Sequence, residues 1–202
     1  MSTVKKPYLI ESIKILENKV YNLDFHQARI ARAMESIYES SATIDFNPIL
    51  QAAQDLDRNI YKLRIVYNDT YLKYEFQPYT LKPIKTLQLI SSNKIAYSHK
   101  FLDRTHLEKL YKLKRAADDI LIVKNGMVTD TYYCNIAFLK EGQWVTPKTP
   151  LLKGTKREQL LNGHQITEAI VYKEDLMQYE RIRLFNAMIE FGDIDLDVKQ
   201  II

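Results

Sequence analysis

The stretch NGMVTDTYYCNIAF, residues 125–138, gives the strongest indication of the fold. Asn125-Gly126 is a dipeptide that two-residue hairpin turns favour, because both positions need a positive φ. The segments on either side of it, DDILIVK and MVTD, contain the β-branched and apolar residues typical of strands. The run CNIAFLKEGQWVTP then predicts a second hairpin, with its turn at Glu141-Gly142. This part of the chain is therefore expected to be strand-rich.

Toward the N-terminus, strands and helices are mixed. Strands are predicted on both sides of residues 17–19 and of residues 68–69, where short polar turns interrupt alternating patterns. A helix is predicted over residues 24–40, with Asp24 as its cap. A second helix is predicted to begin at Asn47, as its cap, because the next residue is a proline.

The remaining pattern shows no regular alternation of strand and helix. It predicts a helix over residues 105–116, a helix over 155–161, a strand over 166–173, a helix over 173–179 and one strand over 181–191. Mixed hairpins and helices of this kind favour an α+β fold. We expect two subdomains, an N-terminal one over residues 1–78 and a strand-rich one over 79–202 that carries Lys100.

Composition excludes several classes of protein. The 202 residues are 46% hydrophobic and 27% charged, as in ordinary globular proteins. The net charge of +4 is mild, so neither nucleic acid nor a membrane is expected as a partner. The chain has a single cysteine, Cys134, which excludes an internal disulfide and a cysteine-rich metal site, and no metal is expected. A protein without disulfides is typical of the cytoplasm, so a cytoplasmic location is expected. No apolar run approaches the ~20 residues that span a bilayer.

Four stretches have an order and spacing that carry chemical information. They are FHQAR with His26 and Arg29, YSHKFLDR with Lys100, the stretch from Thr129-Asp130 to Asn135, and LLKGTKREQLL with Gly154-Thr155-Lys156-Arg157. Together they resemble the class IV aminotransferases, which are the fold-type IV pyridoxal-phosphate enzymes. Each motif alone is weak, but four in the right order make chance an unsatisfactory account.

The resemblance implies roles for three residues. Lys100 would supply the amine that forms a Schiff base with pyridoxal 5'-phosphate, although a solvated surface lysine is the default for any one lysine. Asp130 stands where the family usually has Glu, beside the cofactor's ring nitrogen; the alternative is an exposed turn aspartate. Arg29 would bind the phosphate with its planar fork, unless it is an outward-facing helix charge.

Other residues would complete the phosphate site. The N–H groups of Thr155 and Lys156 follow a glycine at a helix start and can bind an anion, or form a plain helix terminus. Asn186 and Ala187 would close this site, by resemblance alone. Tyr132 and Tyr133 are candidates to line a pocket for a benzenoid substrate.

The resemblance implies an enzyme, and HKFLDR and FNAM favour its aminodeoxychorismate lyase branch. Such an enzyme releases pyruvate and 4-aminobenzoate, a folate precursor. The alternatives are an aminotransferase for D-amino or branched-chain acids, and a pyridoxal-phosphate-binding or interaction protein without turnover. A small-molecule amine would be the substrate, and a homodimer is expected because fold-type IV enzymes are homodimers.

Overall fold

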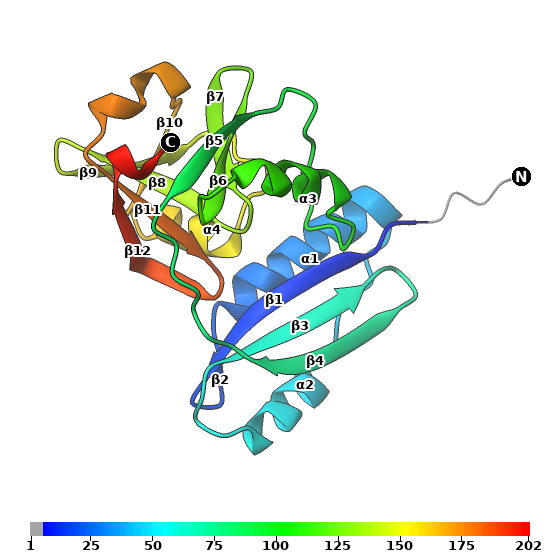
Figure 1. The fold of residues 1–202 in the computed structure, drawn as a ribbon. Helices are drawn as coiled ribbons and strands as arrows, with labels where there is room; N and C mark the ends of the chain where they lie inside the picture. Colours follow the sequence, from blue (N-terminus) through cyan, green and yellow to red (C-terminus); the bar gives the residue numbers. More distant parts are fainter. Residues whose placement is uncertain (1–5) are drawn as a thin grey trace, which may run out of the picture. The chain divides into compact units, whose positions relative to one another are not determined.

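The computed structural model describes residues 6–202 and divides the chain into two compact units. The first unit runs up to Thr80 and includes His99–Asp103. The second comprises Leu81–Ser98 and Arg104–Ile202. Helices and sheets occur together in the chain (Figure 1), which confirms the predicted α+β class.

The first unit is built on an antiparallel sheet in the order β2-β1-β3-β4. Its elements are β1 (Leu9–Leu16), β2 (Lys19–Val20), α1 (Leu23–Tyr38), α2 (Asn47–Ala52), the 3₁₀ helix η1 (Ala53–Asp55), β3 (Tyr61–Tyr67) and β4 (Leu72–Pro78). The hairpins predicted around residues 17–19 and 68–69 are confirmed by β1–β2 and β3–β4.

Both predicted helix caps are wrong by a residue or more. The N-cap of α1 is Asn22, so Asp24 lies inside the first turn. The N-cap of α2 is Phe46, and Asn47 is already helical. The Asp45 carboxylate accepts a hydrogen bond from the Asn47 N–H at 2.9 Å, which supplies one partner to the start of this helix.

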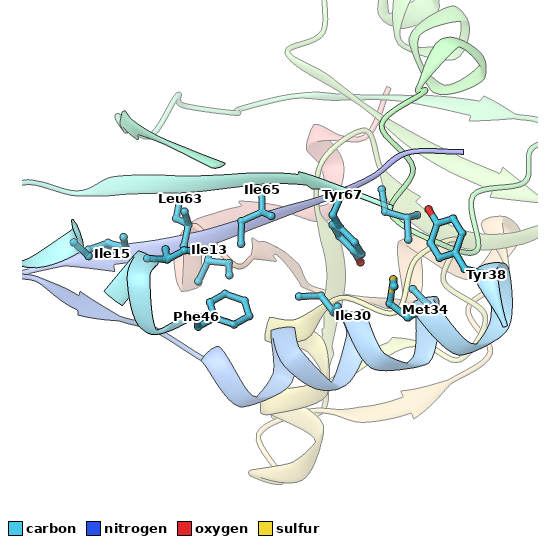
Figure 2. Packing of buried hydrophobic residues seen from close by; sticks show 13 residues of the cluster. Ile13, Ile15, Ile30, Met34, Tyr38, Phe46, Leu63, Ile65 and Tyr67 are labelled. Carbon is cyan, nitrogen blue, oxygen red and sulfur yellow. The ribbon is translucent and has the colours of Figure 1, made fainter. Parts of the chain in front are cut away.

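One face of α1 packs against one face of the sheet (Figure 2). Ile30 and Met34 lie one helical turn apart, and they meet alternate strand residues such as Ile13 and Ile65. Ile13 and Ile65 are fully buried. Burial of such a side chain stabilises the fold by about 1.5–3 kcal/mol, so this cluster is what holds the first unit together.

The segment His99–Asp103 belongs to the first unit because it pairs with β1. The Ile10 N–H donates to the Lys100 carbonyl at 2.9 Å, and the Leu102 N–H donates to the Tyr8 carbonyl at 2.9 Å. The sequence prediction put Lys100 in the subdomain over residues 79–202, whereas the structure groups it with the first unit. Backbone pairing between distant segments is the reason.

The second unit contains two sheets and several helices. Its elements are β5 (Leu87–Ser91), α3 (Thr105–Tyr111), η2 (Lys112–Lys114), β6 (Asp119–Lys124), β7 (Met127–Thr131), β8 (Asn135–Lys140), β9 (Gln143–Pro147), α4 (Thr155–Asn162), β10 (Thr167–Ala169), η3 (Lys173–Gln178), β11 (Arg181–Asn186), β12 (Ile189–Asp197) and η4 (Val198–Gln200). The sheet orders are β5-β6-β7 and β10-β9-β8-β11-β12. Among residues 6–202, no helix combines the length and apolar character needed to cross a bilayer.

Both hairpins predicted in the second unit are confirmed. Asn125 and Gly126 have φ values of 51° and 77°, and Glu141 and Gly142 repeat these values, as the favoured two-residue turn requires. These turns fix the registers of β6 with β7 and of β8 with β9. A side chain added at either glycine would meet no neighbour, so the glycines serve the backbone angle.

The single strand predicted over residues 181–191 is wrong. The chain reverses after Asn186 and forms β11 and β12, which pair antiparallel. The Asn186 Oδ1 accepts hydrogen bonds from the N–H groups of Met188 at 2.8 Å and Ile189 at 3.1 Å. A side chain thus makes the turn, and no glycine or proline marks it in the sequence.

Candidate active site

A buried group of three charged or titratable residues lies between β1 and α1 of the first unit. The Glu11 carboxylate accepts from Arg29 Nε at 2.8 Å and from Arg29 Nη2, and it contacts His26 Nδ1 at 2.7 Å. Glu11 and His26 are fully buried, and Arg29 is nearly so. His26 and Arg29 are three residues apart on α1, which places both on the side that faces the strand.

The charges of this group are mutually compensated. Burial raises the pKa of Glu11, but the Arg29 guanidinium and the contact with His26 outweigh it and lower the pKa to about 2. Burial lowers the pKa of His26 despite its hydrogen bond to Glu11, so its imidazole is neutral and Nδ1 must donate to the carboxylate. Glu11 and Arg29 therefore form the buried ion pair.

Lys100 lies in the same unit as this group. Its carbonyl is fixed by Ile10 of β1, the residue before Glu11. Its positive charge contributes to lowering the pKa of His26, so the two side chains are within electrostatic range. Its neighbour His99 contacts the Ser36 hydroxyl through Nε2 at 3.0 Å.

In the second unit, Asp130 is buried near the end of β7 and is only 5% exposed. Its Oδ1 accepts from Asn135 Nδ2 at 2.8 Å, and its Oδ2 accepts from the Leu152 N–H at 2.9 Å. Burial raises its pKa to about 6, against these hydrogen bonds. It is therefore not the exposed turn residue that was the alternative reading of the sequence.

Gly154 is needed for close packing beside Asn135. A Cβ at position 154 would lie 2.1 Å from Asn135 Oδ1, far inside contact distance. Asn135 cannot move away easily, because its Nδ2 is held by Asp130 and by the Leu152 carbonyl. The glycine thus positions the amide that positions Asp130, a role that the sequence alone did not indicate.

The start of α4 is buried and densely paired. Thr155 is 2% exposed. The Lys156 ammonium donates to Glu190 at 2.6 Å. Arg157 donates to the Pro147 carbonyl and to Glu168. The Lys156 side chain is thus directed at a carboxylate, and its N–H is the part that fits the predicted role.

Asn186 connects the β11–β12 turn to the loop before β8. Its Nδ2 donates to the Tyr133 carbonyl and to Cys134 Sγ, both at 3.3 Å. Asn186 and Ala187 are partly buried. Cys134 is buried and its pKa is raised to about 12, chiefly by burial, so it remains a thiol and packs as a small apolar residue.

Sequence reasoning missed Arg104, whose guanidinium lies over the rings of Tyr132 and Tyr133 at 4.5 and 4.8 Å. It also gave no role to Glu11. The indication for Glu11 was its position in LIESIKIL. It lies two residues from both Leu9 and Ile13, so it is on the same buried face of the strand as these two apolar residues. A charged residue on the core-facing side of a strand indicates a functional role.

The residues present fit pyridoxal phosphate chemically. Lys100 offers an amine and Arg29 a guanidinium in one unit; Asp130 offers a buried carboxylate in the other. The Asp130 carboxylate accepts hydrogen bonds from Asn135 and from the backbone of Leu151 and Leu152, and a carboxylate has about four acceptor sites, so one remains for a hydrogen bond from a protonated ring nitrogen. Among residues 6–202, no cluster of three or more His, Cys, Asp or Glu is arranged to hold a metal ion.

Comparison with known proteins gives a consistent result. Residues 8–195 match the family described as amino-transferase class IV. An uncharacterized protein of Haemophilus influenzae is 35% identical over 182 residues, covering 89% of this chain and 97% of its own. A protein from Haemophilus somnus 129PT, whose crystal structure is provisionally named 4-amino-4-deoxychorismate lyase, is 34% identical to this chain, with a TM-score of 0.86. The match covers 92% of this chain and 98% of that chain.

A more distant structure shares the fold. A hypothetical aminotransferase from Mycobacterium tuberculosis, in its form with pyridoxal phosphate bound, has a TM-score of 0.80 at 14% identity. It covers 98% of this chain and 82% of its own.

Replacing Glu11 with Gln keeps the shape but leaves the Arg29 charge without its buried partner. We expect the free energy of unfolding at pH 7 to fall by about 3–5 kcal/mol, measured by urea denaturation. The partly exposed pair of Glu75 with Arg64, at 3.3 Å, provides the control, and Glu75→Gln should cost less than about 1 kcal/mol.

The effect of Glu11→Gln should also depend on pH. Because folding lowers the pKa of Glu11 from 4.5 to about 2, its stabilisation is complete above the higher value and is lost as pH falls toward the lower one. The gap in stability between wild type and variant should therefore narrow from pH 6 to pH 3. Equal losses for Glu11→Gln and Glu75→Gln would contradict this account.

Proposed function

The chain belongs to the class IV aminotransferases, a family of pyridoxal-phosphate enzymes, and we propose that it is a 4-amino-4-deoxychorismate lyase. The reaction would release pyruvate and 4-aminobenzoate, which is a folate precursor. The observation that carries the proposal is that the backbone of Lys100 is hydrogen-bonded to Ile10 of β1, in one unit with the buried Glu11–Arg29 pair. The likeness to the Haemophilus somnus chain supports the choice of lyase.

The proposed work of Lys100 has two parts. Its Nζ would hold pyridoxal phosphate covalently and would be freed when the substrate amine takes its place. The bound cofactor supplies an electron sink. The freed Nζ then takes the proton from the substrate carbon that carries the amine. The C–O bond to the enolpyruvyl group breaks with its electron pair on oxygen, the ring becomes aromatic, and the enolate gains a proton to give pyruvate.

The remaining residues are proposed to hold the cofactor. Arg29 would bind the phosphate while Glu11 fixes the orientation of its guanidinium. The N–H groups of Thr155 and Lys156 would add donors, as would the backbone at Asn186 and Ala187. Asp130 would accept a hydrogen bond from the protonated ring nitrogen, and the positive charge of that nitrogen would draw the pKa of Asp130 below the raised value it has alone.

Amino transfer to a keto acid is the competing reaction of this family. One assay separates the two: pyruvate and 4-aminobenzoate release from 4-amino-4-deoxychorismate, run beside amino transfer from a panel of D- and L-amino acids, including branched-chain ones. Release without transfer is the result that the proposal requires. Transfer without release would assign the chain to the aminotransferases.

We place the reaction in the cytoplasm, in keeping with the unpaired Cys134.

We also propose that the active form is a homodimer with two-fold symmetry, which is the commonest closed assembly. Light scattering of the cofactor-loaded protein should give about twice the chain mass of 23.8 kDa. An active monomer at assay concentration would refute the proposal.

Lys100→Ala should abolish both the visible absorbance of the cofactor Schiff base and turnover, because no amine remains. Lys100→Arg should fail as well, since a guanidinium stays protonated and cannot form the bond. Lys94→Ala is the matched control, because this lysine is exposed and precedes Lys100 by only six residues in the sequence. Full activity in either Lys100 variant would show that another group holds the cofactor.

Asp130→Asn should leave cofactor binding largely intact but slow turnover by roughly a hundredfold, which corresponds to ~3 kcal/mol. The amide keeps the shape but cannot hold the ring nitrogen in its protonated form. Asp130→Glu, which restores the usual family residue, should retain more activity than Asn. Wild-type turnover in Asp130→Asn, with Lys100 still essential, would make Asp130 a structural residue.

A further inference from the structure

Arg104 of the second unit has a guanidinium whose hydrogen-bonding capacity is poorly used. Its Nη2 donates to the Tyr132 carbonyl at 2.6 Å. Its Nε is buried and has no acceptor within the described residues 6–202. The ion pairs in the described part of the second unit do not include Arg104, although its charge opposes the rise in the pKa of the buried Asp119 carboxylate that burial causes. A guanidinium has five N–H donors, so Arg104 keeps donors for an anionic ligand.

Aromatic rings surround this guanidinium. Its Cζ lies 4.5 Å from the Tyr132 ring centroid, 4.8 Å from that of Tyr133 and 5.6 Å from that of Tyr97. Such contacts stabilise a cation by electrostatic attraction to the ring faces. They also restrict the side chain to one orientation, so little conformational entropy would be lost on binding a ligand.

The two tyrosines at the centre of this cluster differ in exposure. Tyr132 is buried, stacks on Tyr111 at 4.3 Å, and its N–H donates to the buried Asp119 carboxylate at 3.3 Å. Tyr133 is 61% exposed and meets the Tyr132 ring edge to face at 4.2 Å. Tyr132 is thus a fixed support, whereas Tyr133 presents an uncovered ring beside a cation.

The cluster adjoins the proposed cofactor residues of its own unit. The Tyr133 carbonyl accepts from Asn186, and Asp130 of β7 lies three residues before Tyr133, which is on the connection between β7 and β8. A ligand held at Arg104 and Tyr133 would therefore lie close to groups that the proposed function assigns to catalysis.

We infer that Arg104 is a specificity-determining residue that binds a carboxylate carried on a planar six-membered ring, with Tyr133 stacking on that ring. This inference rests on the proposed function, because 4-amino-4-deoxychorismate and its product 4-aminobenzoate both carry a carboxylate on a six-membered ring, which is planar in the product. A carboxylate matches a guanidinium fork, and an aromatic ring matches the open face of Tyr133. An aliphatic amino acid would use only the first of these two contacts.

Binding of 4-aminobenzoate to the cofactor-loaded protein tests the inference by calorimetry. Arg104→Gln should raise the dissociation constant about 10- to 100-fold, as expected for loss of hydrogen bonds to a charged group. Binding of aniline, which lacks the carboxylate, should change less than about twofold. Arg58→Gln is the matched control, because Arg58 is exposed in the first unit.

A second measurement uses the wild-type protein and does not depend on the folding of a variant. The NMR signal of the Arg104 Nε–H should shift on titration with 4-aminobenzoate and stay in place with aniline. Equal affinity of wild type and Arg104→Gln, an unmoved Nε–H signal, or no binding of 4-aminobenzoate would each overturn the inference. The Schiff-base absorbance of Lys100, recorded on the same samples, reports separately on the proposed function.

Discussion

The hydrogen bond from the Ile10 N–H to the Lys100 carbonyl is the contact on which the account of this protein depends. It attaches a short segment, distant in sequence, to the edge of β1 and so fixes the backbone of the proposed reactive lysine. A flexible lysine would have to be ordered at each turnover, at a cost in conformational entropy. Here the backbone of Lys100 is already ordered in the folded protein, so only its side chain has to be ordered.

The strand that fixes Lys100 also carries Glu11, and this makes β1 the organising element of the first unit. Glu11 occupies a core-facing position where an apolar residue would pack more favourably by itself. A buried ion pair is weak evidence for stability, because desolvation offsets most of its attraction. Its retention is better explained by function: the pair holds Arg29 in one orientation, as a residue that binds a phosphate needs.

The features that the sequence predicted are mostly local ones. The turns at Asn125-Gly126 and Glu141-Gly142 depend on their own residues, so the hairpins follow directly. The turn after Asn186 was missed, because its side chain supplies the hydrogen bonds that usually go with glycine or proline. The residues of the candidate site were proposed from the resemblance of their motifs to a known family, whereas the pairing of Glu11 with Arg29 and the rings around Arg104 arise from tertiary packing.

The central claim is that Lys100 holds the cofactor, and chemical trapping tests it most directly. The cofactor-loaded protein would be reduced with borohydride, digested and mapped by mass spectrometry. Reduction fixes a Schiff base as a stable secondary amine on the lysine that formed it. The account predicts one modified peptide, with the phosphopyridoxyl group on Lys100. Modification of a different lysine in a fully active sample would contradict it.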